Sequence, residues 1–258
     1  DVSPNDIILV KGEHKQPLDS LTEAFNDSIY TNQCIINLAA IASNLTIIRN
    51  KLAPNTRIMV MVKALAYGTD EVRMAKFLET CNVDILGVSY VDEGVALKRA
   101  GVQQAIFVIN AAAYEAAKVV KWDLEIGISD KALITSVAIE AAKHNKKIKV
   151  HLHIDTGMSR FGTRPEEALE LAQLIQHSPS LELVGIMTHF ASADDPSQDE
   201  FTLAQAKKFE AVIQKLKAHG ITIPWHHAAN SSGALRFGFH QFNMARIGLA
   251  VYGLHPSA

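Results

Sequence analysis

Solid apolar runs of strand length alternate along most of the chain with stretches of helical spacing. The runs are rich in β-branched residues and apolar throughout, which is typical of parallel strands that are buried on both faces. Between them, apolar residues recur at the three- and four-residue spacing of a helix that covers a sheet. This pattern predicts eight strands, at 57–63, 84–90, 105–110, 124–129, 148–155, 181–190, 223–230 and 244–253.

Helices are predicted between nearly all of these strands. They cover 38–51, 71–81, 92–101, 113–121, 131–144, 166–177 and 203–219. Eight strand–helix units in succession fit a (β/α)8 TIM-like barrel better than an open doubly wound sheet. Residues 1–29 break the pattern, with a strand-like run followed by a helix-like one, and are predicted to form an N-terminal appendage. The barrel is predicted to occupy 30–258.

Composition narrows the class of protein. The chain has 258 residues, 48% of them hydrophobic, and a formal charge of −2, which argues against a nucleic-acid or polybasic membrane-binding role. No apolar run approaches the roughly 20 residues of a bilayer span, and the first residues lack a signal-peptide layout. The two cysteines and eleven histidines show no metal-ligand spacing. We therefore expect a soluble, cytoplasmic globular protein without a metal site.

Reactive side chains of such barrels lie at the carboxyl ends of the strands and in the loops that follow. These positions hold Lys63, Arg160, His189, Asn230, Ser231, Arg246 and Gly248. Lys63 ends an apolar run, where burial would lower the pKa of its amine, and a neutral amine forms an imine with a carbonyl. Serine hydroxyls and glycine amides after the seventh and eighth strands suit a phosphate. A lysine imine combined with a phosphate site is what pyridoxal phosphate requires.

Five segments, VKALAYG, HIDTGMSRFG, MTHFASADD, HAANSSGAL and MARIGLAVYGLHPS, together resemble the N-terminal barrel of the alanine racemase family. This family comprises the fold-type III pyridoxal phosphate enzymes, and the resemblance runs from about Tyr30 to Ser257. It implies that Lys63 holds the cofactor as an imine and is one of two proton-transfer bases. Arg246 would hydrogen-bond the pyridine nitrogen. Arg160 would lie near the phenolic oxygen of the cofactor and the substrate carboxylate.

The same resemblance assigns the remaining candidates. The phosphate would be bound by the hydroxyls of Tyr67 and Ser231 and the amides of Gly248 and Leu249. His189 and Asn230 would belong to the shell around the ring and its anchoring groups. His153, His226 and His227 are expected to be structural.

The activity implied is conversion of L-alanine to D-alanine for peptidoglycan synthesis, in a homodimer whose active sites are shared between subunits. Two alternatives stay open: a racemase for serine or another amino acid, and a non-catalytic pyridoxal phosphate homeostasis barrel, although HAANS and MARIG favour a racemase. The family's second base is a tyrosine in a β-rich C-terminal domain, which we expect to be absent here because the chain stops at Ala258. NDIILVKG near the start resembles the end of a Mur ligase, which suggests a piece of a ligase–racemase fusion.

Some positions depart from the family pattern. Leu65 stands where the family has an asparagine, and Thr69 and Asp70 replace the usual His-Gly. His153 stands where many members have a lysine, often carbamylated. An anion that would hold Arg160 must therefore come from elsewhere.

Overall fold

A computed structural model describes residues 35–238 and 242–255 of the chain. Eight parallel strands form one sheet in the order β7-β6-β5-β4-β3-β2-β1-β8. The strands are β1 Arg57–Met61, β2 Ile85–Val88, β3 Ile106–Val108, β4 Glu125–Ile128, β5 Ile148–His153, β6 Leu181–Met187, β7 Trp225–His227 and β8 Met244–Ile247. The two edge strands meet, because the backbone N–H of Arg246 donates to the carbonyl of Ala229 at 2.9 Å. The sheet is thus a nearly closed barrel, and the predicted (β/α)8 fold is confirmed.

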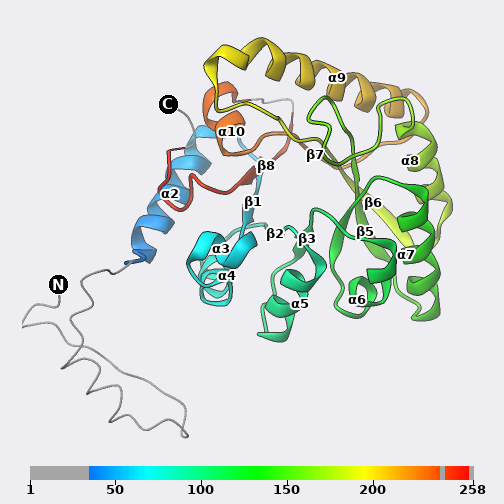
Figure 1. The fold of residues 1–258 in the computed structure, drawn as a ribbon, viewed down its shortest axis with the longest axis horizontal. Coiled ribbons are helices and arrows are strands. Elements are labelled where there is room, and N and C mark those ends of the chain that lie inside the picture. Colours follow the sequence, from blue (N-terminus) through cyan, green and yellow to red (C-terminus); the bar gives the residue numbers. More distant parts are fainter. Residues whose placement is uncertain (1–34, 239–241, 256–258) are drawn as a thin grey trace, which may run out of the picture. The chain divides into compact units, whose positions relative to one another are not determined.

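Helices surround the sheet on its outer side (Figure 1). They are α2 Leu38–Lys51, α3 Lys63–Gly68, α4 Glu71–Thr80, α5 Val91–Arg99, α6 Ala116–Lys121, α7 Lys131–Lys143, α8 Ala168–His177, α9 Asp199–Ala218 and α10 Ser231–Phe237, with 3-10 turns η1 Ala113–Glu115 and η2 Pro196–Gln198. The predicted appendage 1–29 lies outside the described residues. Within the described ranges, no helix is long and apolar enough to cross a membrane.

Several local predictions need correction. The apolar run 57–63 was expected to be strand throughout, but β1 ends at Met61 and Lys63 begins α3. Likewise β6, β7 and β8 end at Met187, His227 and Ile247, before the predicted ends at 190, 230 and 253. An apolar sequence indicates that residues are buried, not that they pair in a sheet. The apolar runs therefore extend past the last paired residue, into buried residues of the following turn. Helix α10 was missed because its sequence, SSGALRF, is too short for a periodic pattern.

The barrel has an inner and an outer core. The outer core packs the sheet against the helices, whereas the inner one fills the barrel itself. The inner core consists of Met59, Met61, Ile85, Phe107, Met187 and Met244. Methionine side chains adapt to irregular space, which suits a barrel interior that also holds polar groups. Beyond this packing, at the carboxyl ends of the strands, lie the polar side chains of the predicted site.

Candidate active site

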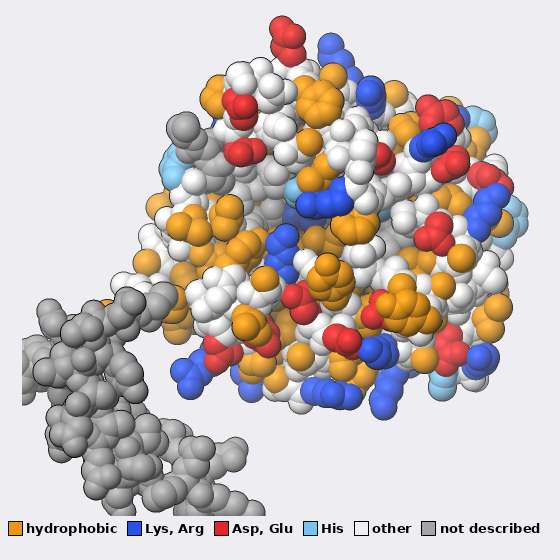
Figure 2. Space-filling model, viewed as in Figure 1, with side chains coloured by type: hydrophobic (Ala, Val, Ile, Leu, Met, Phe, Trp, Pro, Cys, Tyr) orange, Lys and Arg blue, Asp and Glu red, His pale blue; other side chains and the backbone are white. Residues whose placement is uncertain are grey.

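A cavity of about 230 Å³ lies at the carboxyl ends of β1, β7 and β8. Eight predicted site residues line it: Lys63, Tyr67, His189, Asn230, Ser231, Arg246, Gly248 and Leu249. The ninth, Arg160, lines a smaller adjoining space that Lys63 and His189 also border. Figure 2 shows basic side chains in a hollow near the middle of one face of the barrel, with hydrophobic side chains around them. The structure therefore brings all nine residues together, while their roles stay predictions.

The four residues after Lys63 form a left-handed turn, opposite in hand to an ordinary α-helix. Ala64, Leu65, Ala66 and Tyr67 have φ angles of 52°, 55°, 50° and 57°, so α3 is a left-handed helical turn. For residues with a Cβ this conformation costs roughly 1–2 kcal/mol each. The turn is held by Glu93, whose carboxylate accepts from the N–H of Ala64 at 2.8 Å. Strain of this kind persists only where surrounding contacts enforce it, and it commonly marks a functional site.

Leu65 gives a direct test of this strain. Its side chain is 62% exposed, so little packing is lost when it is replaced. Asparagine tolerates positive φ better than leucine does, and we expect Leu65→Asn to raise the free energy of unfolding by about 1 kcal/mol. Urea denaturation measures this change. Leu65→Ala is the control, because it removes the same side chain and keeps the strain. Equal stability of the two variants would show that the turn carries no such cost.

The surroundings of Lys63 favour a neutral amine. Burial lowers the pKa of its ammonium group, and the positive charges of Arg160 and Arg246 lower it further. Glu93 acts in the opposite direction but does not outweigh them. A lysine with a lowered pKa has a larger fraction of free amine near neutral pH, which is the form that attacks a carbonyl.

Tyr67, Gly248 and Ser231 form one wall of the cavity. A Cβ on Gly248 would lie 2.3 Å from the hydroxyl of Tyr67, so only glycine admits that hydroxyl so close to the backbone. Burial raises the pKa of Tyr67 to about 12, which keeps it a hydrogen-bond donor. The hydroxyl of Ser231 accepts from the N–H of Gly248 at 3.0 Å, and it still has its own hydrogen to donate. The wall thus offers neutral donors of the kind that bind a phosphate.

Arg246 is the most deeply buried charge of the site, with 3% of its surface exposed. Burial lowers the pKa of its guanidinium to about 10, which leaves it charged at neutral pH. Its NH1 donates to the carbonyl of His227 at 2.8 Å, and its NH2 to that of Thr188 at 2.8 Å and to Nδ1 of His189 at 3.0 Å. Among the described residues its Nε–H has no acceptor, so this donor suits a ring nitrogen in the cavity.

Asn230 has a structural task as well. Its side-chain oxygen accepts from the N–H of Gly233 at 2.9 Å and so caps the start of α10. The cap fixes the position of Ser231, the first residue of that helix. Asn230 therefore lines the cavity and also orients a neighbour that does.

Two other residues near the site were not predicted to act there. His153 was expected to be structural, yet it lines the small space beside Lys63 and Arg160, and burial lowers its pKa to about 4. Gln205 of α9 is fully buried and bridges two site loops. Its amide NH2 donates to the carbonyl of His189 at 3.1 Å and to Thr156 at 3.3 Å. The alternating HLH of β5 carried a signal for His153, whereas nothing in a helical pattern distinguishes Gln205.

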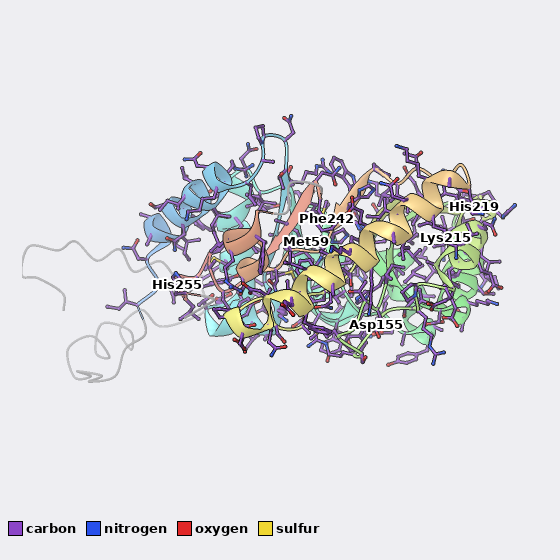
Figure 3. The ribbon with its side chains drawn as sticks, turned by 90° about the horizontal axis from the view of Figure 1, so that it is seen from above. Met59, Asp155, Lys215, His219, Phe242 and His255 are labelled. Atoms are coloured by element: carbon purple, nitrogen blue, oxygen red, sulfur yellow. The ribbon has the colours of Figure 1, made fainter. Side chains whose placement is uncertain are left out.

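A larger cavity of about 520 Å³ lies outside the barrel, between α9 and the loop after β5. Asp155, before the loop that follows β5, and Lys215 of α9 both line it and are labelled in Figure 3. Its lining is Asp155, Thr156, Gly157, Pro165, Glu166, Lys208, Ala211, Val212 and Lys215. None of the nine predicted residues is among them, so size alone does not identify the active site.

The fold and the cavity together define a class of protein: a (β/α)8 barrel with a lysine of lowered pKa, neutral hydroxyl donors and a buried arginine at its carboxyl-terminal mouth. The family described as alanine racemase, N-terminal domain, matches residues 36–256. The chain belongs to the alanine racemase family.

Individual relatives agree with this assignment. The chain is 37% identical to an alanine racemase of Nostoc sp. over 226 residues and 38% identical to one of Treponema denticola over 228 residues. These matches cover 86% and 87% of this chain but 58% and 60% of the relatives. A solved alanine racemase of Clostridium difficile 630, in complex with cycloserine, superposes with a TM-score of 0.82 at 32% identity. That match covers 86% of this chain and 61% of the other. The chain thus spans less than two thirds of the length of these relatives.

Proposed function

We propose that this chain is the pyridoxal phosphate-binding barrel of an amino-acid racemase that interconverts L- and D-alanine. The observation that carries the proposal is the convergence of Lys63, Tyr67, Ser231, Gly248 and Arg246 on one cavity. Alanine is the substrate named for the relatives. A cytoplasmic location and a supply of D-alanine to peptidoglycan are part of the same proposal.

The residues present fit the cofactor. The amine of Lys63 would hold its aldehyde carbon, and the hydroxyls of Tyr67 and Ser231 would bind its phosphate. The unused Nε–H of Arg246 would donate to its ring nitrogen, which must accept because a guanidinium has only donors. When bound, pyridoxal phosphate supplies an electron-withdrawing ring that makes the α-proton of the substrate acidic.

Racemisation needs proton transfer on both faces of the α-carbon. Lys63 would serve one face, because its amine has a lowered pKa and borders both parts of the cavity. We propose that the second base is a tyrosine from a region of the relatives that this chain does not match, contributed by the partner subunit of a homodimer. Arg160, beside Lys63, would bind the substrate carboxylate.

Cofactor binding can be tested directly. We expect added pyridoxal phosphate to give a visible absorption band, and borohydride reduction to attach one cofactor to each chain at Lys63. Peptide mapping by mass spectrometry locates the label. Lys98 is the internal control, because burial also lowers its pKa but its amine donates to the backbone carbonyl of Gln104 at 2.8 Å. A label on Lys98 or any other lysine would contradict the assignment.

Turnover distinguishes a racemase from a cofactor carrier. L-alanine and D-alanine are incubated separately in D2O with the cofactor-loaded protein, and we expect at least one of them to gain deuterium at the α-carbon, which NMR detects, because Lys63 serves one face. Serine and a basic amino acid, tested in parallel, report substrate preference. A protein that binds the cofactor at Lys63 and exchanges none of these amino acids would be a carrier, and the racemase proposal would be wrong.

A further inference from the structure

A chain of hydrogen-bonded side chains crosses the interior of the barrel. It starts at Arg246 on β8, whose NH1 lies 3.2 Å from Nδ1 of His227 on β7. Nε2 of His227 lies 2.8 Å from Nδ1 of His151 on β5. Nε2 of His151 lies 3.1 Å from a carboxylate oxygen of Glu125 on β4. Four strands thus contribute one side chain each to a continuous path that begins at the candidate site.

The donor and acceptor of every hydrogen bond in this path follow from Arg246, where the path begins. Arginine has only donors, so Nδ1 of His227 must accept and its hydrogen must be on Nε2. That hydrogen is donated to Nδ1 of His151, which places the hydrogen of His151 on Nε2 as well. His151 in turn donates to Glu125, which as a carboxylate only accepts. Every hydrogen bond of this path is therefore donated in the same direction, from the guanidinium towards the carboxylate.

The packing around the two imidazoles leaves them little freedom. A Cβ on Gly185 would lie 1.9 Å from Nδ1 of His151, so this glycine makes room for the ring. The ring of Phe107 packs against both histidines, at centroid distances of 4.6 Å and 5.7 Å. His151 and His227 are fully buried. Neither ring can turn to find another partner without repacking the inner core.

Glu125 is the anionic group at the end of the hydrogen-bonded path. Among the described residues, Arg246 forms no ion pair with a carboxylate. Glu125 lies at the first residue of β4, and its side chain is 13% exposed. Burial is the largest single effect and raises the pKa of this carboxyl group, but the hydrogen bond and charge of His151 together with Lys149 outweigh it and keep the pKa below its ordinary value. A carboxylate at one end and a guanidinium at the other are therefore joined through two imidazoles.

We propose that Glu125 is a positioning residue for the active site: it fixes the tautomers of His151 and His227 and thereby orients the guanidinium of Arg246. If Glu125 cannot accept, Nε2–H of His151 loses its partner. If the hydrogen of His151 moved to Nδ1, it would face the Nε2–H of His227. If His227 reversed its tautomer as well, its Nδ1–H would face an N–H of Arg246. The consequence for cofactor binding rests on the proposed function, whereas the order of the tautomers does not.

Nitrogen-15 NMR of the histidine rings, recorded on the full chain without cofactor, tests the order itself. We expect the hydrogen on Nε2 in both His151 and His227 of the unmodified protein. Glu125→Gln keeps an acceptor and should keep both tautomers. Glu125→Leu removes it and should change the tautomer, or shift the Nε2–H resonance, of His227, which does not contact Glu125. A hydrogen on Nδ1 of His227 in the unmodified protein overturns the proposal without any variant.

The affinity for pyridoxal phosphate tests whether Glu125 supports cofactor binding through Arg246. We expect Glu125→Leu to weaken the binding of pyridoxal phosphate by about tenfold or more, the usual effect of losing a hydrogen bond that involves a charged group. Glu125→Gln still offers an acceptor and should retain most of the affinity. Glu140→Leu is the matched control, because Glu140 pairs with His144 on the exposed side of α7. Unchanged His227 resonances and affinity in Glu125→Leu overturn the inference. Failure of the unmodified protein to bind the cofactor would instead contradict the proposed function.

Discussion

Acidification from pH 7.5 to pH 5 is expected to lower the free energy of unfolding, by about 2 kcal/mol for His153 alone and by more with His189 and His227. Three histidines cause the loss: His153 and His227 are buried, and His189 is partly buried at the wall of the cavity. Burial is the main cause that lowers the pKa of each, and the nearby positive charge of Arg246 lowers it further. In the unfolded chain each would have the ordinary value of about 6.5. Below that pH the unfolded state binds more protons than the folded state, so stability falls as pH falls.

The size of the effect follows from linkage. A histidine that stays neutral in the folded state while its unfolded form binds a proton contributes about 2 kcal/mol of destabilisation by pH 5. For His153 the loss levels off near its folded pKa of about 4, where the folded state also takes up the proton. Protonation of His189 and His227 in the unfolded state acts in the same direction. Because a typical domain is stabilised by only roughly 5–15 kcal/mol, we expect the protein to be clearly less stable at pH 5 than at pH 7.5.

Urea denaturation at a series of pH values measures this dependence. His153→Gln removes one titrating group and should reduce the loss between pH 7.5 and pH 5 by about 2 kcal/mol. His219→Gln is the control, since His219 is an exposed residue at the end of α9 (Figure 3). Stability that stays constant down to pH 5 would mean that these histidines take up protons in the folded state without cost.

The fold was predictable because burial on both faces leaves a strong signal in a parallel strand. Each of the eight apolar runs contains a strand of the sheet, and β8 holds Arg246 as expected. The boundaries were less predictable, because Lys63 follows an apolar run that continues beyond the paired residues. The left-handed turn at 64–67 was not predictable, since KALAYG contains no glycine at these positions to indicate positive φ.

The candidate site was partly predictable for a similar reason. Residues at the carboxyl ends of strands must meet at one mouth of a barrel, and this rule alone selects Lys63, Ser231 and Arg246. The path from Arg246 to Glu125 depends instead on which side chains point inward from four separate strands. Sequence spacing within one strand says nothing about those distances. Contacts of this kind follow from closure of the barrel.

Substitution of Lys63 is expected to have the largest effect on catalysis. Lys63→Met keeps the length of the side chain and removes both of the proposed roles of the amine, covalent anchor and base. A positioned acid–base group contributes about 10²–10⁴-fold to proton transfer, so deuterium exchange into alanine by the cofactor-loaded protein should fall by at least about 10²-fold. Lys98→Met is the matched control, because it removes a second lysine of lowered pKa that does not line the cavity.

Chemical rescue separates the two tasks of Lys63. Lys63→Ala leaves space beside Tyr67 and His189 for a small primary amine, which can replace the missing base without restoring the covalent link to the chain. Added methylamine should therefore recover part of the exchange in Lys63→Ala and none in Lys63→Met, where the side chain still fills the space. The recovery should increase with pH, because only the neutral amine accepts a proton. Exchange that persists undiminished in Lys63→Met would place the base elsewhere, and the role assigned to Lys63 would be wrong.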